Sequence, residues 1–285
     1  MADVDLRPMS LGEVLDRTFS LYKQNFWLFA GITAIPFLVL FAFRVASVAL
    51  QSANVGVVRP GGGTPGVSTA PLAAGIATAL VVVLVYLVLA GAAQAATIFA
   101  VSDLYLGKTA SVRDSYRRVG SKAFRVILIL ILTALVVGVG FILLIIPGFI
   151  LLCRTAVAVP AAMLENSKTI RSIDRSMELT KGHAMQIFLI FLLVWVLAYV
   201  AAFIFQVPFA YLQAGALKAH ETLSLGTLIL QNLSAFLSEV LIGPIGTIAF
   251  SLMYYNLRVR KEAFDVQHLM ASLGSQPAPE TPSAI

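Results

Sequence analysis

The chain has 285 residues, of which 59% are hydrophobic and 12% are charged, and its formal net charge is +6. Soluble domains usually carry about 25% charged residues, so this composition excludes an ordinary water-soluble protein. The positive charges lie in short connecting segments, and we therefore interpret them as a signal of membrane orientation and not as a nucleic-acid-binding surface.

Three long segments, residues 60–102, 126–153 and 184–217, contain no Asp, Glu, Lys or Arg. A helix needs about 20 apolar residues to cross a hydrocarbon core of roughly 30 Å. The apolar residues are continuous and do not alternate with polar ones, which excludes a transmembrane barrel and leaves helices. The sequence therefore predicts an all-α integral membrane protein.

Six membrane spans are predicted in chain order. One helix covering both the third and the fourth span would be about 60 Å long, too long for a single crossing. We place the break at Pro147-Gly148, because proline lacks a backbone donor and glycine permits a sharp turn. The spans then form three hairpins in one membrane domain, residues 1–265, at about residues 25–47, 79–101, 124–147, 148–164, 184–205 and 234–256.

The remaining segments carry weaker signals. Residues 51–71 contain Gly-Gly-Gly and several prolines, which predicts a flexible exposed loop. Residues 207–233 are more apolar and are expected to form a short helix on the outer interface. Pro244 is expected to kink the last span, and residues 266–285 are predicted to be a largely disordered cytoplasmic tail.

The orientation follows from the distribution of Lys and Arg. Sixteen of them lie in or beside the segments on one side of the predicted spans, and only Arg59 and Lys218 lie on the other. Because the positively charged connections of membrane proteins stay in the cytoplasm, both termini are predicted to be cytoplasmic.

Each predicted hairpin follows a basic segment that is expected to form an amphipathic helix at the cytoplasmic interface. Ser10 with Glu13 forms a capping box, and Ser111 with Asp114 provides a similar start for the second helix. Thr169 begins the third. Such helices usually lie in the headgroup plane, although any positively charged connector tends to be amphipathic.

The apolar face of the third helix is predicted to hold Ile170, Ile173 and Met177, and Gly182 is its expected C-terminal stop. Basic residues on the opposite faces of the second and third helices are the candidates for contact with anionic headgroups. They are Arg113, Arg117, Arg118, Arg171, Arg175 and Lys181.

Three charged residues, Arg44, Arg154 and Glu239, fall inside the predicted spans at a similar depth. Charges at membrane depth are usually paired or face a cavity, so we expect Glu239 to meet Arg154 or Arg44. One interpretation is a polar site that opens outward for an anionic headgroup or solute. The other is an internal structural pair, or arginines that extend to the surface.

No catalytic residue, metal site or cofactor is predicted. Gly107-Lys108-Thr109 looks like the end of a P-loop, but Ser102 stands where that motif needs a glycine, and a membrane helix precedes it. The histidines, His183, His220 and His268, are too far apart to show metal-ligand spacing.

Three stretches resemble a bacterial family of membrane proteins, the glycerophosphoryl diester phosphodiesterase membrane domain. They are Arg7-Pro8 with LGEVLDRTF at residues 11–19, RSMELTKG at residues 175–182 preceded by Val159-Pro160 and Glu165, and YYNLRVRKEAFD at residues 254–265. The resemblance implies a membrane module that in some relatives is joined to a soluble phosphodiesterase domain. The His-Arg-Gly signature of that domain is absent, so the resemblance implies a stand-alone module without catalytic residues.

The sequence therefore predicts a non-catalytic multi-pass protein of the bacterial cytoplasmic (inner) membrane. Its expected partners are membrane lipids with anionic headgroups, and a membrane or cytoplasmic protein is a further possibility. The alternative function is a small transporter or channel that uses the region of Arg44, Arg154 and Glu239.

Overall fold

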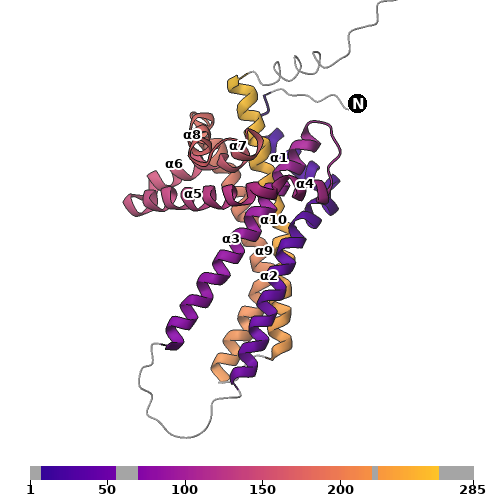
Figure 1. Cartoon of the computed structure of the whole chain (residues 1–285), viewed down its shortest axis with the longest axis vertical. Helices are drawn as coiled ribbons and strands as arrows, with labels where there is room; N and C mark the ends of the chain where they lie inside the picture. The colour runs from indigo at the N-terminus through magenta and orange to yellow at the C-terminus, as the bar shows by residue number, and fades with distance from the viewer. Residues whose placement is uncertain (1–7, 56–69, 220–223, 263–285) are drawn as a thin grey trace, which may run out of the picture.

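The computed structural model describes residues 8–55, 70–219 and 224–262, and all regular structure within these ranges is helical (Figure 1). The elements in chain order are α1 (Leu11–Gln24), α2 (Phe26–Val55), α3 (Ala70–Tyr105), α4 (Val112–Val119), the 3-10 turn η1 (Gly120–Lys122), α5 (Ala123–Leu143), α6 (Ile145–Thr155), α7 (Ala158–Leu164), α8 (Thr169–Thr180), α9 (Ala184–Ala219) and α10 (Leu225–Glu262).

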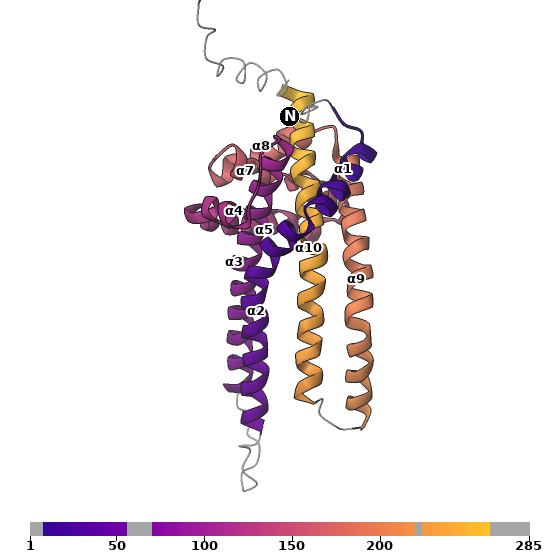
Figure 2. The ribbon, with the colours of Figure 1, turned by 90° about the vertical axis from the view of Figure 1, so that its right-hand side faces the viewer.

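Four long helices, α2, α3, α9 and α10, run along the long axis of the molecule (Figures 1 and 2). The shortest of them, α2, has 30 residues, which gives about 45 Å at 1.5 Å per residue and exceeds the hydrocarbon thickness. Helix α10 is central and contacts α1, α2, α3, α7, α8 and α9. It therefore connects the long helices to the short ones.

Six helical segments are long and apolar enough to cross a membrane, which agrees with the prediction of a multi-pass membrane protein. They are Phe26–Val48, Val81–Tyr105, Ala123–Leu143, Ile145–Leu164, Ala184–Ala219 and Leu225–Glu262. The fourth segment is not one continuous helix, because it contains α6, α7 and the two-residue break between them.

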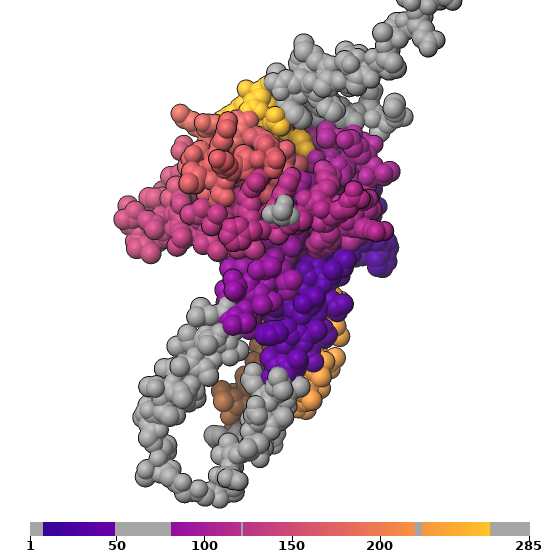
Figure 3. All heavy atoms as spheres, in the orientation of Figure 1, coloured from indigo at the N-terminus to yellow at the C-terminus, as the bar shows by residue number. Residues whose placement is uncertain are grey.

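The hairpin formed by α5 and α6 does not lie alongside the long helices as the prediction of three similar hairpins requires. Figure 1 shows both helices running across the long axis, and Figure 3 shows the hairpin projecting from the rest of the surface. Its tip is apolar and exposed: Ile142 is 86% exposed and Ile146 is 73% exposed. An apolar run shows that a segment avoids water, but it does not specify the direction in which the helix points.

The turn of this hairpin lies at Leu144, a few residues before the predicted break. Leu144 has extended backbone angles, and Pro147 fits in the first turn of α6, where no backbone donor is needed. Gly148 lies outside the turn and allows α6 to pack closely on α5, since a Cβ placed there would lie 2.5 Å from the ring of Phe141. The predicted role of Gly148 as a turn residue is therefore wrong.

Helices α1, α4 and α8 lie at one end of the molecule, which we call the α8 end (Figure 2). Their starts and stops agree with the sequence. Ser10 and Glu13 form the reciprocal capping box, with nitrogen–oxygen distances of 2.6 and 3.3 Å. The Ser111 hydroxyl accepts from the Asp114 amide at 3.1 Å, and Gly182 has a φ of +87° just after α8.

The predicted apolar face of α8 is only partly correct. Ile170 is 71% exposed, whereas Ile173 is buried together with Ser176 and Thr180. The Ser176 hydroxyl donates to the carbonyl oxygen of Arg154 over 2.7 Å, and the Thr180 hydroxyl is shared between that carbonyl, at 3.2 Å, and the carbonyl of Ser176, at 2.8 Å. Because α6 ends at Thr155, that carbonyl lacks its intrahelical partner, and the need to satisfy it turns the hydroxyl-bearing face of α8 inward.

The stretch 207–233 does not form a separate interfacial helix. Helix α9 continues to Ala219 and α10 begins at Leu225, so most of this stretch extends the two long helices. Pro244 lies inside α10. The tail 266–285 and most of the loop predicted at residues 51–71 lie outside the described residues.

Candidate functional sites

A network of charged side chains joins α7, α8 and α10 at the α8 end. The Arg175 Nε donates to both oxygens of Glu165, over 3.1 and 3.2 Å, and its guanidinium also donates to Glu262. Arg258 Nε donates to Glu262 over 3.0 Å, and the Tyr254 hydroxyl donates to Glu165 over 2.9 Å. Two arginines and two carboxylates therefore satisfy one another.

Arg175, one of the predicted headgroup contacts, has its guanidinium in this network. Burial alone would lower the pKa of Arg175, but the hydrogen bonds to Glu262 and Glu165 outweigh it and raise the pKa above the ordinary value. Arg175 is thus a permanently charged member of an internal ion-pair network. The network holds the helices together, and within it the charge of Arg175 is neutralised by Glu165 and Glu262.

The C-terminal part of α10 also binds backbone groups of distant segments. Asn256 and Met9 exchange two hydrogen bonds of 2.8 and 3.0 Å. The Lys261 ammonium donates to the carbonyls of Glu178 and Lys181, over 2.6 and 2.9 Å. These carbonyls lie at the end of α8, where that of Glu178 also accepts from the Lys181 amide over 3.4 Å, so Lys261 adds a C-terminal cap to that helix.

A basic cavity of about 430 Å³ lies beside this network, between α3, α4, η1, α7 and α10. Arg118, Lys122 and Arg258 line it, and none of the described residues around it contributes a carboxylate. Its other lining groups are the polar side chains of Ser102, Tyr255 and Asn166 and the apolar side chains of Phe99, Leu106, Met163 and Leu164. We call this the basic cavity.

Two cations of the basic cavity, Arg118 and Lys122, contact the ring of Phe99, and one of them is also paired with a carboxylate. The Arg118 guanidinium lies 4.6 Å and the Lys122 ammonium 5.3 Å from the centre of the Phe99 ring, a geometry that favours cation–π attraction. Arg118 also pairs with Asp103 at 2.5 Å. Among the described residues, no carboxylate pairs with Lys122, so the cavity retains an excess of positive charge.

The sequence predicted one lining residue of the basic cavity, Arg118. It missed Lys122 and Arg258, because they come from separate elements that converge only in the folded chain. The other headgroup candidates of α4 and α8 do not line the cavity, and their side chains are exposed around the α8 end. They are Arg113, Arg117, Arg171 and Lys181.

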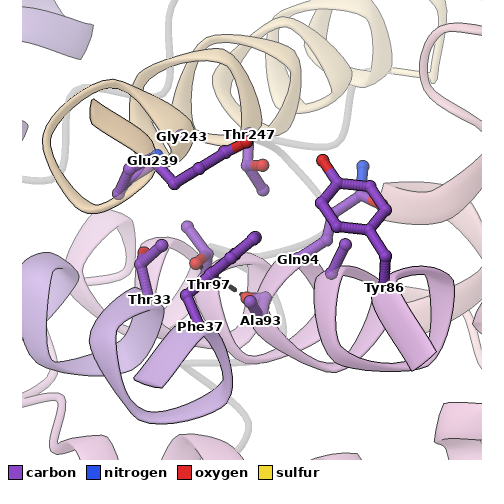
Figure 4. Close-up of a pocket in the computed structure, with 11 residues that line it drawn as sticks. Thr33, Phe37, Tyr86, Ala93, Gln94, Thr97, Glu239, Gly243 and Thr247 are labelled. Atoms are coloured by element: carbon purple, nitrogen blue, oxygen red, sulfur yellow. Dashed lines mark hydrogen bonds between the residues drawn. The ribbon is translucent and has the colours of Figure 1, made fainter. Parts of the chain in front are cut away.

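A second cavity, of about 190 Å³, lies between α2, α3 and α10 within the bundle of long helices (Figure 4). We call it the Glu239 cavity. Figure 4 shows side chains of α10 facing those of α2 and α3. Its polar lining residues are Thr33, Tyr86, Gln94, Thr97, Glu239 and Thr247.

Glu239 was expected to meet Arg154 or Arg44, and the structure brings only Arg44 near it. Arg44 and Glu239 line one small crevice next to the Glu239 cavity, although they form no direct ion pair. Arg154 lies on α6, and its backbone is bound to α8. The expectation that all three share one depth is therefore wrong, because α6 lies across the long helices and carries Arg154 to the α8 end.

The uncharged polar groups of the Glu239 cavity were also missed by the sequence interpretation. They follow helical spacing, with Tyr86, Gln94 and Thr97 on one face of α3 and Glu239 and Thr247 on one face of α10. A search for polar residues at this spacing within the apolar runs would have found them.

Within the parts of the chain that the structure describes, no three His, Cys, Asp or Glu side chains gather to hold a metal ion. No model of a known protein family, no curated protein sequence and no solved structure matches this chain. The three stretches that carry the family resemblance do meet at the α8 end, through the Glu165–Arg175 pair, the Tyr254 hydrogen bond and the Asn256–Met9 pair.

Proposed function

We propose that this protein is a non-catalytic module of the bacterial inner membrane that binds an anionic phospholipid through the basic cavity. The observation that carries the proposal is the cavity itself, in which Arg118, Lys122 and Arg258 converge without a lining carboxylate. Lys and Arg near an anionic membrane surface each contribute roughly 1 kcal/mol to binding. Arg118 pairs with Asp103 and Arg258 with Glu262, but with Lys122 they still supply an excess of positive charge and several N–H donors, which suit a phosphate group better than a neutral headgroup.

The remaining lining of the cavity suits the rest of such a lipid. Ser102, Tyr255 and Asn166 provide hydrogen-bonding groups for phosphate and glycerol oxygens. Phe99 and Met163 provide apolar surface where an acyl chain would begin. Arg125 donates to the lining residue Asn166 over 3.0 Å, which adds a fourth positive charge near the cavity.

The proposed orientation places the α8 end in the cytoplasm, where anionic lipids and positively charged connections coincide. Helices α1, α4 and α8 lie together at that end (Figure 2), and Arg113, Arg117 and Arg171 are exposed there. These exposed cations would attract anionic lipid without selecting it, while the basic cavity would hold one molecule. The family resemblance adds no activity to this proposal.

The proposal is tested by adding lipid to the purified protein in neutral detergent and following the thermal unfolding midpoint. Phosphatidylglycerol is expected to raise the midpoint of the wild type far more than phosphatidylcholine does. The double variant Arg118→Gln/Lys122→Gln should lose this difference. Arg113→Gln/Arg117→Gln is the matched control, because it removes the same charge from the same end of the molecule without changing the cavity lining.

The quantity compared is the shift caused by lipid and not the starting midpoint, since Arg118→Gln also removes the pair with Asp103. An equal shift in both double variants would mean that charge at the surface, and not the cavity, binds the lipid. That result would refute the proposal.

A second candidate function, a small transporter or channel, is favoured by the Glu239 cavity alone. Polar groups inside a bundle of membrane helices are where carriers hold their solutes. Uptake of a labelled solute into proteoliposomes, compared between the wild type and Glu239→Gln, tests this candidate directly.

A further inference from the structure

The carboxylate of Glu239 is half-buried in the bundle of long helices, and the described cation that acts on it electrostatically is Arg44. Glu239 forms no hydrogen bond and no ion pair with any described residue. It lies on α10 within the bundle of long helices and faces the cavity beside Gly243, whose Cβ, if added, would lie 3.8 Å from Glu239 Oε2. An unpaired carboxylate in an apolar bundle is unfavourable unless a proton or a cation accompanies it.

The neighbouring hydroxyls are oriented to accept. Thr33 Oγ1 donates its hydrogen to the carbonyl of Phe29 over 2.9 Å, and Thr97 Oγ1 donates to the carbonyl of Ala93 over 2.8 Å (Figure 4). A hydroxyl has one hydrogen and two lone pairs, so both threonines keep only acceptor capacity for the cavity. Together with Glu239 they supply acceptors to the cavity, while Gln94 and Tyr86 also bring donor groups to its lining.

The cavity also presents aromatic surface. Phe37 and Tyr86 line it, with ring centres 6.0 Å apart and planes inclined by 67°. Aromatic faces attract organic cations, and this attraction increases when the site is removed from water.

The cavity itself carries a negative charge. Glu239 is the one charged side chain among the described residues that line it, and Arg44 lies outside this lining in the adjoining crevice, where it offsets only part of that charge. Because Arg154 is bound to α8, no described arginine lines the cavity to attract an anion. The anionic ligand expected from the sequence therefore does not fit this site.

We propose that the Glu239 cavity binds a small organic ammonium ion. Its volume of about 190 Å³ is several times the roughly 30 Å³ that one water molecule occupies in the liquid, so it has room for a few carbon atoms as well as the charged nitrogen. The ammonium group donates to Glu239, Thr33 and Thr97, and the carbon atoms contact Phe37 and Tyr86. This site is independent of the basic cavity and requires no transport across the membrane.

The test is a titration of the purified protein, in nanodiscs of neutral lipid, with ethylammonium chloride against sodium chloride at equal ionic strength. Ethylammonium is expected to raise the thermal unfolding midpoint in a saturable manner, and sodium is not. In Glu239→Gln the dissociation constant should rise by roughly tenfold or more, because a charge-assisted hydrogen bond is lost.

Two further variants keep the result interpretable. Glu178→Gln removes an exposed carboxylate far from the cavity and should bind as the wild type does. Gly243→Ala adds a methyl group at ordinary contact distance from Thr33, 3.7 Å, so it should fold normally and still weaken binding by filling the cavity. If Glu239→Gln does not fold, Gly243→Ala decides the question.

Three outcomes overturn the proposal. One is that ethylammonium does not raise the thermal unfolding midpoint, which would mean that Glu239 binds a proton and no ammonium ion. Another is an equal effect of sodium, which would indicate an alkali-metal site or ionic strength. The last is unchanged ethylammonium binding in both Glu239→Gln and Gly243→Ala. None of these results affects the headgroup proposal, which depends on Arg118, Lys122 and Arg258.

Discussion

The hydroxyl of Tyr254 donates to the carboxylate of Glu165 over 2.9 Å, although the two residues are 89 positions apart in the chain. The same carboxylate accepts from Arg175. One side chain at the end of α7 therefore fixes both α8 and α10. The basic cavity lies directly beside this junction, because Arg258 contributes to both.

Replacing Tyr254 with phenylalanine removes the hydrogen bond to Glu165 and a longer one, 3.4 Å, that the hydroxyl accepts from Arg258, and it leaves the ring in place. We expect the free energy of unfolding to fall by about 1–2 kcal/mol, since a single hydrogen bond usually contributes about 1 kcal/mol. Chemical denaturation in micelles measures it. Tyr199→Phe is the control, since Tyr199 is 64% exposed and should tolerate the change; equal losses in both variants would contradict the assigned role of Tyr254.

Arg175 and Glu262 should show energetic coupling in a double-mutant cycle. Each single change, Arg175→Gln or Glu262→Gln, leaves a half-buried charge with one of its two partners, and we expect a loss of about 2 kcal/mol. The double variant should lose clearly less than the sum of the two. Glu178→Gln removes an exposed carboxylate 3.9 Å from Arg175 and should cost at most about 0.5 kcal/mol. Strict additivity at Arg175 and Glu262 would contradict the ion-pair network.

The contribution of Arg175 to the free energy of unfolding should not vary from neutral to moderately alkaline pH. Its pKa is raised in the folded protein by the bonds to Glu262 and Glu165, despite the opposing effect of burial. A raised pKa contributes stability that is complete below the unfolded pKa and is lost only as the pH rises through the folded value. The difference in unfolding free energy between the wild type and Arg175→Gln should therefore be constant from about pH 7 to about pH 10. A decline within that range would contradict a raised pKa of Arg175.

The close packing of α5 on α6 predicts opposite effects for two glycines of the hairpin. Gly148→Ala places a methyl group 2.5 Å from the Phe141 ring and should destabilise the protein by about 1–3 kcal/mol. Gly138→Ala meets no atom within 4 Å and should be neutral or stabilising by about 0.5 kcal/mol, because alanine favours the helix. Thermal unfolding of both variants measures the contrast, and similar effects would mean that the hairpin is packed differently.

Local features of the fold could be predicted from the sequence because each depends on neighbouring residues. The charge-free runs locate the apolar helices, and Ser10 with Glu13 and Ser111 with Asp114 mark helix starts. Gly182 marks a stop because its backbone adopts a conformation that glycine readily allows.

Features that depend on distant contacts could not be predicted in this way. Hydropathy does not indicate that α5 and α6 run across the long helices. The depth predicted for Arg154 was wrong for the same reason. The inward face of α8 is set by a carbonyl of α6 and not by the position of Ile170. Lys122 and Arg258 belong to different elements, so the basic cavity exists only after folding.

The most direct test of the headgroup proposal is native mass spectrometry of protein extracted gently from its membrane. We predict that the wild type and Arg113→Gln/Arg117→Gln retain an anionic phospholipid, and that Arg118→Gln/Lys122→Gln loses it. If the latter variant retains the lipid as well as the wild type does, or if the wild type carries none, the basic cavity is not a headgroup site.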